Sequence, residues 1–414
     1  KGSICAMLYA MLRAGQIRVG LYTSPHLADV RERIRVSDTQ SGWTRPDNGS
    51  DWITPTECAT LVEQLQPAVA AVAQEFPASP PTYFEVLTAL AFLHFAKRGV
   101  AVAVLEVGMG GRLDATNVVE QAVSVFGPID VDHADVLGHD PVMIAREKAA
   151  IIKPGQVVIS APQHEEVAAL LDATCAAQGA TLLRVGRALT VQITRQDLEG
   201  LTLSIVGCRG RYDALTLSLL GRHQACNAAV AIGALEALSP IGVPHTLIKR
   251  GLSQVAWPGR LEVVHDHPLV LLDWAHNAQA AACLADALTE LCPDRRWHLV
   301  IGMSSDKSVE AFGQRLGLAD VPPRPSGQRL GPSCASVTCT KSAHPRALDP
   351  YELARRLAPC CAAVAIIPDV TDAVTVLLNT VSPDDVIVVT GSVFLIGELR
   401  SALRGVDTRD ASMR

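Results

Sequence analysis

Short apolar strands alternate with helical segments along almost the whole chain, and this alternation limits the fold more than any other feature. Runs such as Val100–Leu105, Gln156–Ser160 and Leu269–Leu272 predict buried strands. Parallel strands need long crossover connections, which are usually helical, so the pattern favours an α/β fold with mainly parallel sheets. Leu183–Leu219 differs, because it alternates polar and apolar residues and carries a Gly-Cys-Arg-Gly sequence at a predicted hairpin.

The predicted elements fall into two groups, one on each side of a linker. Helices are expected at Ser3–Arg13, Thr54–Gln74, Glu85–Ala96, Pro141–Ile151, Glu165–Ala177 and Ala225–Leu238. Further strands are expected at Arg18–Tyr22, Ala122–Phe126, His298–Ile301, Ala335–Thr338, Ala363–Ile367 and Val386–Val389. The sequence Ala256-Trp257-Pro258-Gly259 marks the linker, and Val321–Pro332 is expected to be a flexible loop. We therefore expect a domain of residues 1–256 and a smaller domain of residues 257–414.

The composition excludes several classes of function. The net charge is −6 and the pI is near 6.1, so the chain lacks the basic surface that binds nucleic acid. No uninterrupted apolar run approaches the roughly 18 residues that span a membrane. The eleven cysteines show no C-x-x-C pair and no zinc-ligand spacing, which indicates reduced thiols in a cytoplasmic protein. Because the chain begins at Lys1, we expect a fragment, and its sequence does not address targeting.

Polar side chains follow several of the predicted strands. Glu106 ends the run Val100–Leu105 and is followed by glycines, Ser24 follows a second strand, and His133 follows a third. Taken alone, each has an ordinary explanation, such as a turn or an exposed histidine. Because the carboxyl ends of parallel strands meet at one edge of a sheet, we expect them to converge there on a nucleotide–metal site. Oxygen ligands suit Mg²⁺, and histidine suits Mn²⁺ or an outer position.

Two lysines extend this pattern. Lys1-Gly2-Ser3 runs into a predicted helix, and a lysine followed by small residues at a helix start is a weak indication of a phosphate-binding loop. Lys148 lies near the end of the predicted helix Pro141–Ile151, where a cation also stabilises the helix end without any further role.

The order and spacing of these motifs resemble the folylpolyglutamate synthase/dihydrofolate synthase family of Mur-ligase-like ATP-dependent amide ligases. The similar segments are Lys1-Gly2-Ser3, which resembles the end of the family's phosphate loop, Thr23–Leu27 with Arg31–Ile34, Tyr83-Phe84-Glu85, Leu105–Asn117, Asp132-His133, Glu147–Lys153, Gly221–Gln224 with Asn227, Trp257–Glu262, Asp273 with Ala275-His276-Asn277, and Thr390-Gly391-Ser392. The resemblance covers nearly the whole chain. It implies an N-terminal P-loop-type ATPase domain with a mostly parallel sheet, followed by a smaller Rossmann-like α/β domain.

The resemblance also implies roles for individual residues. The phosphates of ATP would be held by Lys1, Gly2 and Ser3, with His276 nearby, and ATP would also contact Asn227, Arg260 and Asp273. Two Mg²⁺ or Mn²⁺ ions would be bound by Ser24, Glu106 and His133, and Lys148 would be a carbamylated lysine. The pterin-bearing substrate would be bordered by Phe84 and Arg33. Lys1, Lys148 and His276 are the expected catalytic residues.

The implied activity is that of an acid–amino-acid ligase in folate biosynthesis. ATP would activate the carboxylate of dihydropteroate or a tetrahydrofolate polyglutamate as an acyl phosphate, and the amine of L-glutamate would attack it. Two domains closing over ATP would protect the acyl phosphate from water. We expect a monomer that binds neither nucleic acid nor membranes.

The chain departs from the family pattern at three places. Trp274 stands where the family usually has a small residue or valine, Ala149-Ala150 replaces a common Ala-Gly, and most of the phosphate loop lies outside the chain. Three other interpretations therefore stay open: a Mur-type ligase acting on a peptidoglycan precursor, an inactive truncated fragment that binds partners, and a nucleotide-driven switch. Thr23–Ile34 and Tyr83–Glu85 favour the folate branch, but they do not separate dihydrofolate synthase from folylpolyglutamate synthase or from a bifunctional enzyme.

Overall fold

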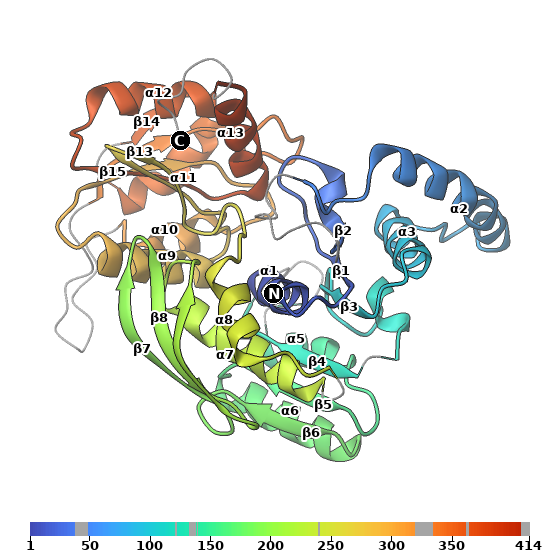
Figure 1. Cartoon of the computed structure of the whole chain (residues 1–414). Coiled ribbons are helices and arrows are strands. Elements are labelled where there is room, and N and C mark those ends of the chain that lie inside the picture. Colours follow the sequence, from blue (N-terminus) through green and yellow to red (C-terminus); the bar gives the residue numbers. More distant parts are fainter. Residues whose placement is uncertain are drawn as a thin grey trace. The chain divides into compact units, whose positions relative to one another are not determined.

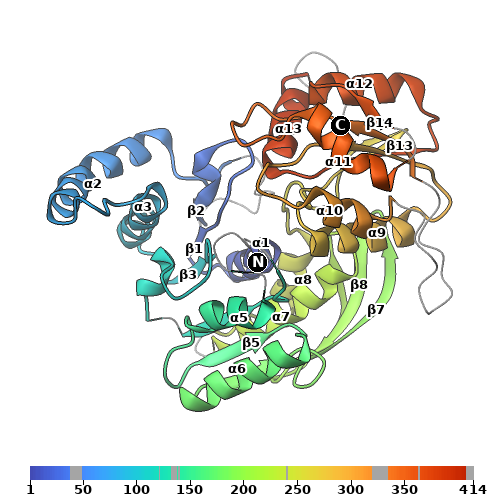
Figure 2. The same ribbon diagram turned by 180° about the vertical axis from the view of Figure 1, so that it is seen from behind.

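The computed structural model describes residues 1–37, 49–120, 122–131, 138, 140–238, 241–318, 334–361 and 364–406 (Figures 1 and 2). The chain divides into two compact units. Unit 1 comprises Lys1–Thr194, Thr202–Ser218 and Gln224–Ala256, and unit 2 comprises Arg195–Leu201, Leu219–His223 and Trp257–Arg414. Two short segments that precede the predicted linker thus cluster with unit 2.

Unit 1 contains two small sheets built around parallel strands. The first has the order β2 (Ile34–Val36), β1 (Val19–Tyr22) and β3 (Val102–Leu105), with β1 parallel to β3 and antiparallel to β2. The second has the order β4 (Val123–Phe126), β5 (Val157–Ser160) and β6 (Thr181–Arg184), all parallel.

The expectation that the strands before Ser24, Glu106 and His133 share one parallel sheet is not met among the described residues. β1 and β3 form one sheet, whereas β4 belongs to the other. The segment between β3 and β4 holds a glycine-rich loop and the short 3₁₀ helix η3 (Ala115–Val118) rather than the long helix that usually connects neighbouring parallel strands.

A third sheet in this part of the chain confirms the predicted hairpin. It has the order β7 (Thr190–Asp197), β8 (Gly200–Val206) and β9 (Arg211–Leu217). The Gly-Cys-Arg-Gly turn joins β8 to β9, and the Gly207 N–H donates to the Gly210 oxygen at 2.8 Å. The buried Glu236 carboxylate receives the N–H groups of Cys208 and Arg209, which fixes this turn to the helix that carries Glu236.

The helices of unit 1 follow the predicted segments closely. They are α1 (Gly2–Ala14), α2 (Pro55–Glu75), α3 (Tyr83–Lys97), α5 (Pro141–Ala149), α6 (Glu165–Ala177), α7 (His223–Ala237) and α8 (His245–Ser253), with the 3₁₀ helix η1 (Val30–Arg33) before β2. α2 and α3 lie side by side in both views, and each begins with a capping box, Thr54 with Glu57 and Thr82 with Glu85 (Figures 1 and 2). The sequence did not predict α8, β2 or β10.

α1 is the central helix of unit 1, because every residue from Gly2 to Ala14 is buried. It packs against β1, β3 and α8. α8 approaches so closely that a Cβ at Gly251 would lie 2.7 Å from the Met11 Cα. Glycine is therefore required at this crossing, and the close packing fixes where the N-terminal end of α1 lies.

Unit 2 is a six-stranded Rossmann-like sheet with helices on its faces. The strand order is β10 (Glu262–Asp266), β11 (Leu269–Leu272), β15 (Val386–Thr390), β12 (Trp297–Ile301), β13 (Cys334–Cys339) and β14 (Val364–Ile366), with only β10 antiparallel. α9 (Ala278–Leu291), α10 (Val309–Leu316) and α11 (Pro350–Leu357), followed by η4 (Ala358–Cys360), pack together, and α12 (Val370–Thr380) packs with α13 (Val393–Val406). This arrangement confirms the prediction of a Rossmann-like α/β fold for the second domain. The predicted loop Val321–Pro332 lies outside the described residues.

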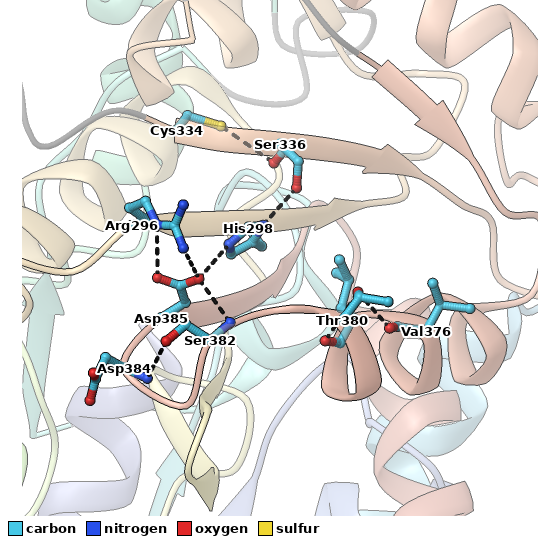
Figure 3. A network of polar contacts seen from close by, with 10 residues as sticks. Arg296, His298, Cys334, Ser336, Val376, Thr380, Ser382, Asp384 and Asp385 are labelled. Atoms are coloured by element: carbon cyan, nitrogen blue, oxygen red, sulfur yellow. Dashed lines mark hydrogen bonds and ion pairs between the residues drawn. The ribbon is translucent and has the colours of Figure 1, made fainter.

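The buried Asp385 carboxylate joins three strands of unit 2 at their amino ends (Figure 3). Arg296 donates two hydrogen bonds to it, at 3.1 and 2.9 Å, and His298 Nε2 contacts it at 3.2 Å. The other ring nitrogen of His298 lies 2.8 Å from the Ser336 hydroxyl of β13. Burial raises the pKa of Asp385, but the hydrogen bonds from Arg296 and His298 more than offset this and hold the pKa below its ordinary value.

No helix in the described part of the chain is long and apolar enough to cross a membrane.

Replacing Asp385 with asparagine should destabilise unit 2 by about 1.5–3 kcal/mol at pH 7, because hydrogen bonds to a charged carboxylate are lost. A carboxyl whose pKa is lowered by folding stabilises the protein above its unfolded pKa, about 3.9, and loses this contribution as the pH falls through the folded pKa. Urea unfolding should therefore show a large difference between the two proteins at pH 7 and a smaller one near pH 3.

The exposed neighbour Asp384 provides the control, since Asp384→Asn removes the same charge. Asp384 meets the network only through its backbone N–H, which donates to the Ser382 hydroxyl at 3.4 Å and is kept in the variant. Its effect should stay within about 0.5 kcal/mol. Equal effects of the two substitutions would contradict the stabilising role of the Asp385 network.

Candidate active site

The carboxyl ends of β1 and β3 bring Ser24 and Glu106 together. The two strands are in register from Val19 opposite Val102 to Tyr22 opposite Leu105, so both chains leave the sheet at the same level. The Glu106 N–H donates to the Tyr22 oxygen at 2.8 Å, and the Ser24 N–H donates to Glu106 Oε2 at 3.3 Å. The carboxylate of Glu106 is therefore held, buried, beside the Ser24 backbone.

The N-terminal end of α1 lies against the same edge. Lys1 Nζ donates to the oxygens of Val107 and Gly108 at 2.7 and 3.1 Å, directly after Glu106. Burial, followed by the charge of Glu106, raises the pKa of the Cys5 thiol in the first turn of α1 to about 12. A helix N-terminus favours anions, so the Lys1 ammonium and the first turn of α1 are groups that could hold a phosphate beside this carboxylate.

The glycine-rich loop after Glu106 can approach its neighbours closely only because it has no side chain at Gly108 and Gly111. A Cβ at Gly108 would lie 2.6 Å from the Phe84 ring, and a Cβ at Gly111 would lie 2.6 Å from the Glu147 oxygen and 2.9 Å from the Lys148 oxygen. The Arg112 N–H also donates to the Glu147 oxygen at 3.0 Å. The loop therefore packs directly on the end of α5.

Asp114 stabilises this loop from within. Its carboxylate accepts the N–H groups of Met109 and Thr116, both at 3.0 Å, and the Thr116 hydroxyl at 2.6 Å. Lys153 Nζ donates to the Asn117 oxygen at 3.4 Å. Asp114 and Lys153, which belong to family-like motifs, thus contribute to the shape of the loop.

Lys148 is half-buried at the end of α5, where its backbone contacts the glycine-rich loop. The helix was predicted to continue to Ile151 but ends at Ala149, because the Ile151 and Ile152 N–H groups bond to the Lys148 and Ala149 oxygens in a tighter turn. The predicted ligand His133 lies outside the described residues. Among the residues that are described, no cluster of three or more His, Cys, Asp or Glu side chains is arranged to hold a metal ion.

α7 reaches the start of α1 through a short chain of amide groups. The Asn227 amide donates to Gln224 Oε1 at 2.9 Å, and the Gln224 amide donates to the Ser3 hydroxyl at 3.4 Å. The sequence placed Asn227 and Ser3 in the site separately. The i, i+3 spacing of Gln224 and Asn227 on one helix face was the signal for the link between them.

The two predicted substrate residues lie in neighbouring positions of unit 1. Phe84, at the start of α3, packs against Tyr22 with ring centroids 5.9 Å apart and covers Gly108. The Arg33 guanidinium lies 5.9 Å from the centre of the Tyr83 ring, and its Nε donates to His26 Nδ1 at 2.9 Å. Phe84 is therefore close to the glycine-rich loop, and Arg33 is held beside Tyr83, the residue before Phe84.

Unit 2 brings together the remaining predicted residues at the end of β11. The buried Asp273 carboxylate accepts the N–H groups of Leu261 at 3.0 Å and Ala275 at 2.8 Å. Burial raises the pKa of Asp273, opposed by the charge of Arg260 and by these two N–H groups. His276 Nδ1 donates to the Trp274 carbonyl oxygen at 3.0 Å. Because a carbonyl can only accept, this hydrogen bond requires His276 to be protonated at Nδ1.

Comparisons with known proteins match both parts of the chain to domains of one family. The Mur ligase middle domain matches residues 56–235, and the glutamate ligase domain of Mur ligases matches residues 259–393. The dihydrofolate synthase/folylpolyglutamate synthase of Mycobacterium tuberculosis is 34% identical over 97% of this chain and 83% of its own length. The chain belongs to the folylpolyglutamate synthase/dihydrofolate synthase family.

Other family members differ in length and in what they bind. A probable bifunctional folylpolyglutamate synthase/dihydropteroate synthase of Halobacterium salinarum is 35% identical over 97% of this chain, which spans 45% of that relative. The M. tuberculosis folylpolyglutamate synthase complexed with ADP has a TM-score of 0.86 at 33% identity, covering 97% of this chain and 88% of that one. E. coli FolC in complex with DHPP and ADP has a TM-score of 0.81 at 27% identity, covering 98% and 86%.

The Gly111→Ala substitution should destabilise unit 1 by about 1–3 kcal/mol, because the added Cβ meets backbone oxygens of α5 that cannot rotate away. Gly127→Ala is the matched control, since its Cβ would meet only the Ile4 side chain, at 4.0 Å. Thermal unfolding of both variants measures the difference. A normal melting temperature for Gly111→Ala would show that the loop does not pack on α5 in this way.

Proposed function

We propose that this chain is an ATP-dependent ligase that joins L-glutamate to the carboxylate of a pteroate or folate. The observation that carries the proposal is the grouping of Lys1, Ser24 and Glu106 where β1 and β3 end beside α1. Family membership supports the substrate class, because relatives carry the names dihydrofolate synthase and folylpolyglutamate synthase. Dihydrofolate synthase, folylpolyglutamate synthase and a bifunctional enzyme all fit this proposal.

The donor set of unit 1 suits a divalent metal. A buried carboxylate and a neighbouring serine are hard oxygen donors, and Mg²⁺ is usually held by one or two carboxylates together with substrate phosphates and water. In the proposal Glu106, Ser24 and His133 would hold two divalent ions. A relative from Yersinia pestis was solved with AMPPNP and a Mn ion, which supports a divalent cation. Bound metal would neutralise charge on the phosphates of ATP.

Lys1, Gly2 and Ser3 are the proposed phosphate-binding residues of this chain. The Lys1 ammonium is held at the carbonyls that follow Glu106, so its charge stays close to the proposed metal ligands. The backbone of the first turn of α1 adds N–H donors for an anion. Ser3 is linked through Gln224 to Asn227, which supports a nucleotide-contacting role for Asn227.

Lys148 is proposed to be carbamylated. Addition of CO₂ to its amine would replace a cation by an anion, and an anion near Glu106 would support bound metal. The packing of the glycine-rich loop on the Glu147 and Lys148 backbone supports this assignment, because it fixes Lys148 relative to Glu106. In unit 2, the proposed ATP contacts are Arg260, Asp273 and His276. In unit 1, Phe84 and Arg33 are proposed to border the pterin.

The proposed reaction proceeds in two steps. An oxygen of the folate carboxylate attacks the γ-phosphorus of ATP, giving an acyl phosphate and ADP. The amine of L-glutamate then attacks the acyl carbon, phosphate leaves, and an amide forms. Lys1 stabilises the negative charge that develops on the transferred phosphoryl group, since it is a fixed cation next to the site.

Product analysis tests the proposal. The chain is incubated with ATP, Mg²⁺ and L-glutamate, with dihydropteroate in one reaction and tetrahydrofolate in another, and products are identified by mass spectrometry. We expect a product one glutamyl unit heavier in at least one reaction, with one ADP released per amide. ADP release that is independent of glutamate and folate, or activity only with a UDP-muramoyl acceptor, would refute the proposal.

Glu106→Gln should abolish metal-dependent ligation and leave the fold largely intact, because glutamine keeps the size of the side chain but not the charge that binds metal. The exposed Glu165→Gln in α6 is the control and should leave the rate unchanged. Ligation rates are measured across a Mg²⁺ titration, with circular dichroism confirming the fold. Full activity of Glu106→Gln would remove Glu106 from the site.

A further inference from the structure

Trp274 forms an aromatic platform for Arg260 in unit 2. The Arg260 guanidinium carbon lies 4.1 Å from the centre of the Trp274 ring. Trp274 itself is only 7% exposed, so water is largely excluded from one side of this pair. Cation–π contacts are stronger when they are desolvated than at exposed sites. The stack therefore favours one orientation of the guanidinium.

The backbone on both sides of Arg260 is fixed by the same short segment. The Trp274 N–H donates to the Gly259 oxygen at 3.1 Å, and the Asp273 carboxylate accepts the Leu261 N–H at 3.0 Å. Gly259 has φ 73° and Leu261 has φ 49°, which is an unfavourable backbone region for leucine. Such strain is typically retained where a neighbouring residue has to be held in place. Both the backbone and the side chain of Arg260 are thus held by Asp273 and Trp274.

The indole is not explained by core stability alone. Trp274 Nε1 is buried and has no hydrogen-bond partner among the described residues, which destabilises the folded protein. Phenylalanine would fill much of the same space without this cost. Tryptophan offers the stronger face for a cation, so the stack with Arg260 gives a physical reason for the indole. Trp274 also stands at a position where the family usually has a small residue or valine.

We propose that Trp274 is a positioning residue that orients Arg260 for ATP. The inference rests on the proposed function, in which Arg260 contacts the nucleotide, and it adds a role for Trp274. An arginine that is oriented before ATP arrives loses less side-chain entropy on binding, so the stack should increase ATP affinity. Trp274 acts only through Arg260 and does not itself touch the phosphates.

Calorimetric titration of the full chain with ATP and Mg²⁺ tests the proposal. Trp274→Leu should weaken ATP binding about 2- to 12-fold, since Arg260 would no longer be held in one orientation before ATP binds. Trp274→Phe should weaken it less and should have an unchanged or higher melting temperature, because a weaker face remains and the buried N–H is removed. In an Arg260→Ala background, Trp274→Leu should cause no further loss of affinity.

Trp297→Phe is the matched control. Trp297 is also buried in unit 2 with an unpartnered Nε1 among the described residues, but it lies in the core strand β12. Its substitution should leave ATP affinity unchanged. If Trp274→Leu does not fold, Trp274→Phe and the Arg260→Ala background still decide the question.

The possible outcomes separate the inference from the function on which it rests. Loss of affinity in Arg260→Ala but wild-type affinity in both Trp274 variants would overturn the positioning role alone. Additive losses in the double variant would also overturn it, because Trp274 would then act independently of Arg260. If Arg260→Ala binds ATP normally, the proposed nucleotide contact and the inference fail together. If Trp274 and Arg260 are coupled in ATP binding but no glutamylated product forms, only the proposed ligase function fails.

Discussion

The parallel pairing of β1 with β3 is the constraint on which the site in unit 1 depends. Tyr22 lies opposite Leu105, and the Glu106 N–H continues the ladder by donating to the Tyr22 oxygen. A shift of this register by one residue would move Glu106 away from Ser24 and reverse the faces on which the side chains lie. The carboxylate is thus positioned by backbone hydrogen bonds in a buried sheet, which is more rigid than a position on a loop.

Close packing by glycines then places the other parts of unit 1 around Glu106. Gly251 lets α8 approach α1, Gly108 lets Phe84 cover the loop, and Gly111 lets the loop touch the end of α5. The first contact holds α1 in place, and the other two join Phe84 and α5 to the loop that follows the β1–β3 edge. Unit 2 uses a different device, because Asp273 fixes the Arg260 turn through two backbone hydrogen bonds and Trp274 orients the arginine side chain.

Much of this architecture could be predicted from the sequence. Apolar runs such as Val100–Leu105 identified the strands, and the carboxylate at the end of one strand and the serine after another indicated the edge where Glu106 and Ser24 meet. The prediction of strands such as Leu269–Leu272 succeeded because burial along the whole strand leaves a continuous apolar signal that a local sequence pattern can reveal.

The rest depended on contacts between distant residues. The expectation of a single sheet was wrong because strand order is set by long-range pairing, which periodicity does not report. The sequence gives little indication of three contacts between distant residues: Gln224 with Ser3, Lys1 with Val107, and Arg260 with Trp274. The Asp385 network has the same character, because its members come from three strands (Figure 3).

The proposed reaction depends on a divalent metal that Glu106 and Ser24 hold beside the N-terminus of α1. Anomalous X-ray diffraction from crystals of this chain grown with Mn²⁺ and a non-hydrolysable ATP analogue measures this most directly. We expect an anomalous peak within coordination distance of the Glu106 carboxylate and the Ser24 hydroxyl. A bound nucleotide whose metal peak lies away from both residues would contradict it.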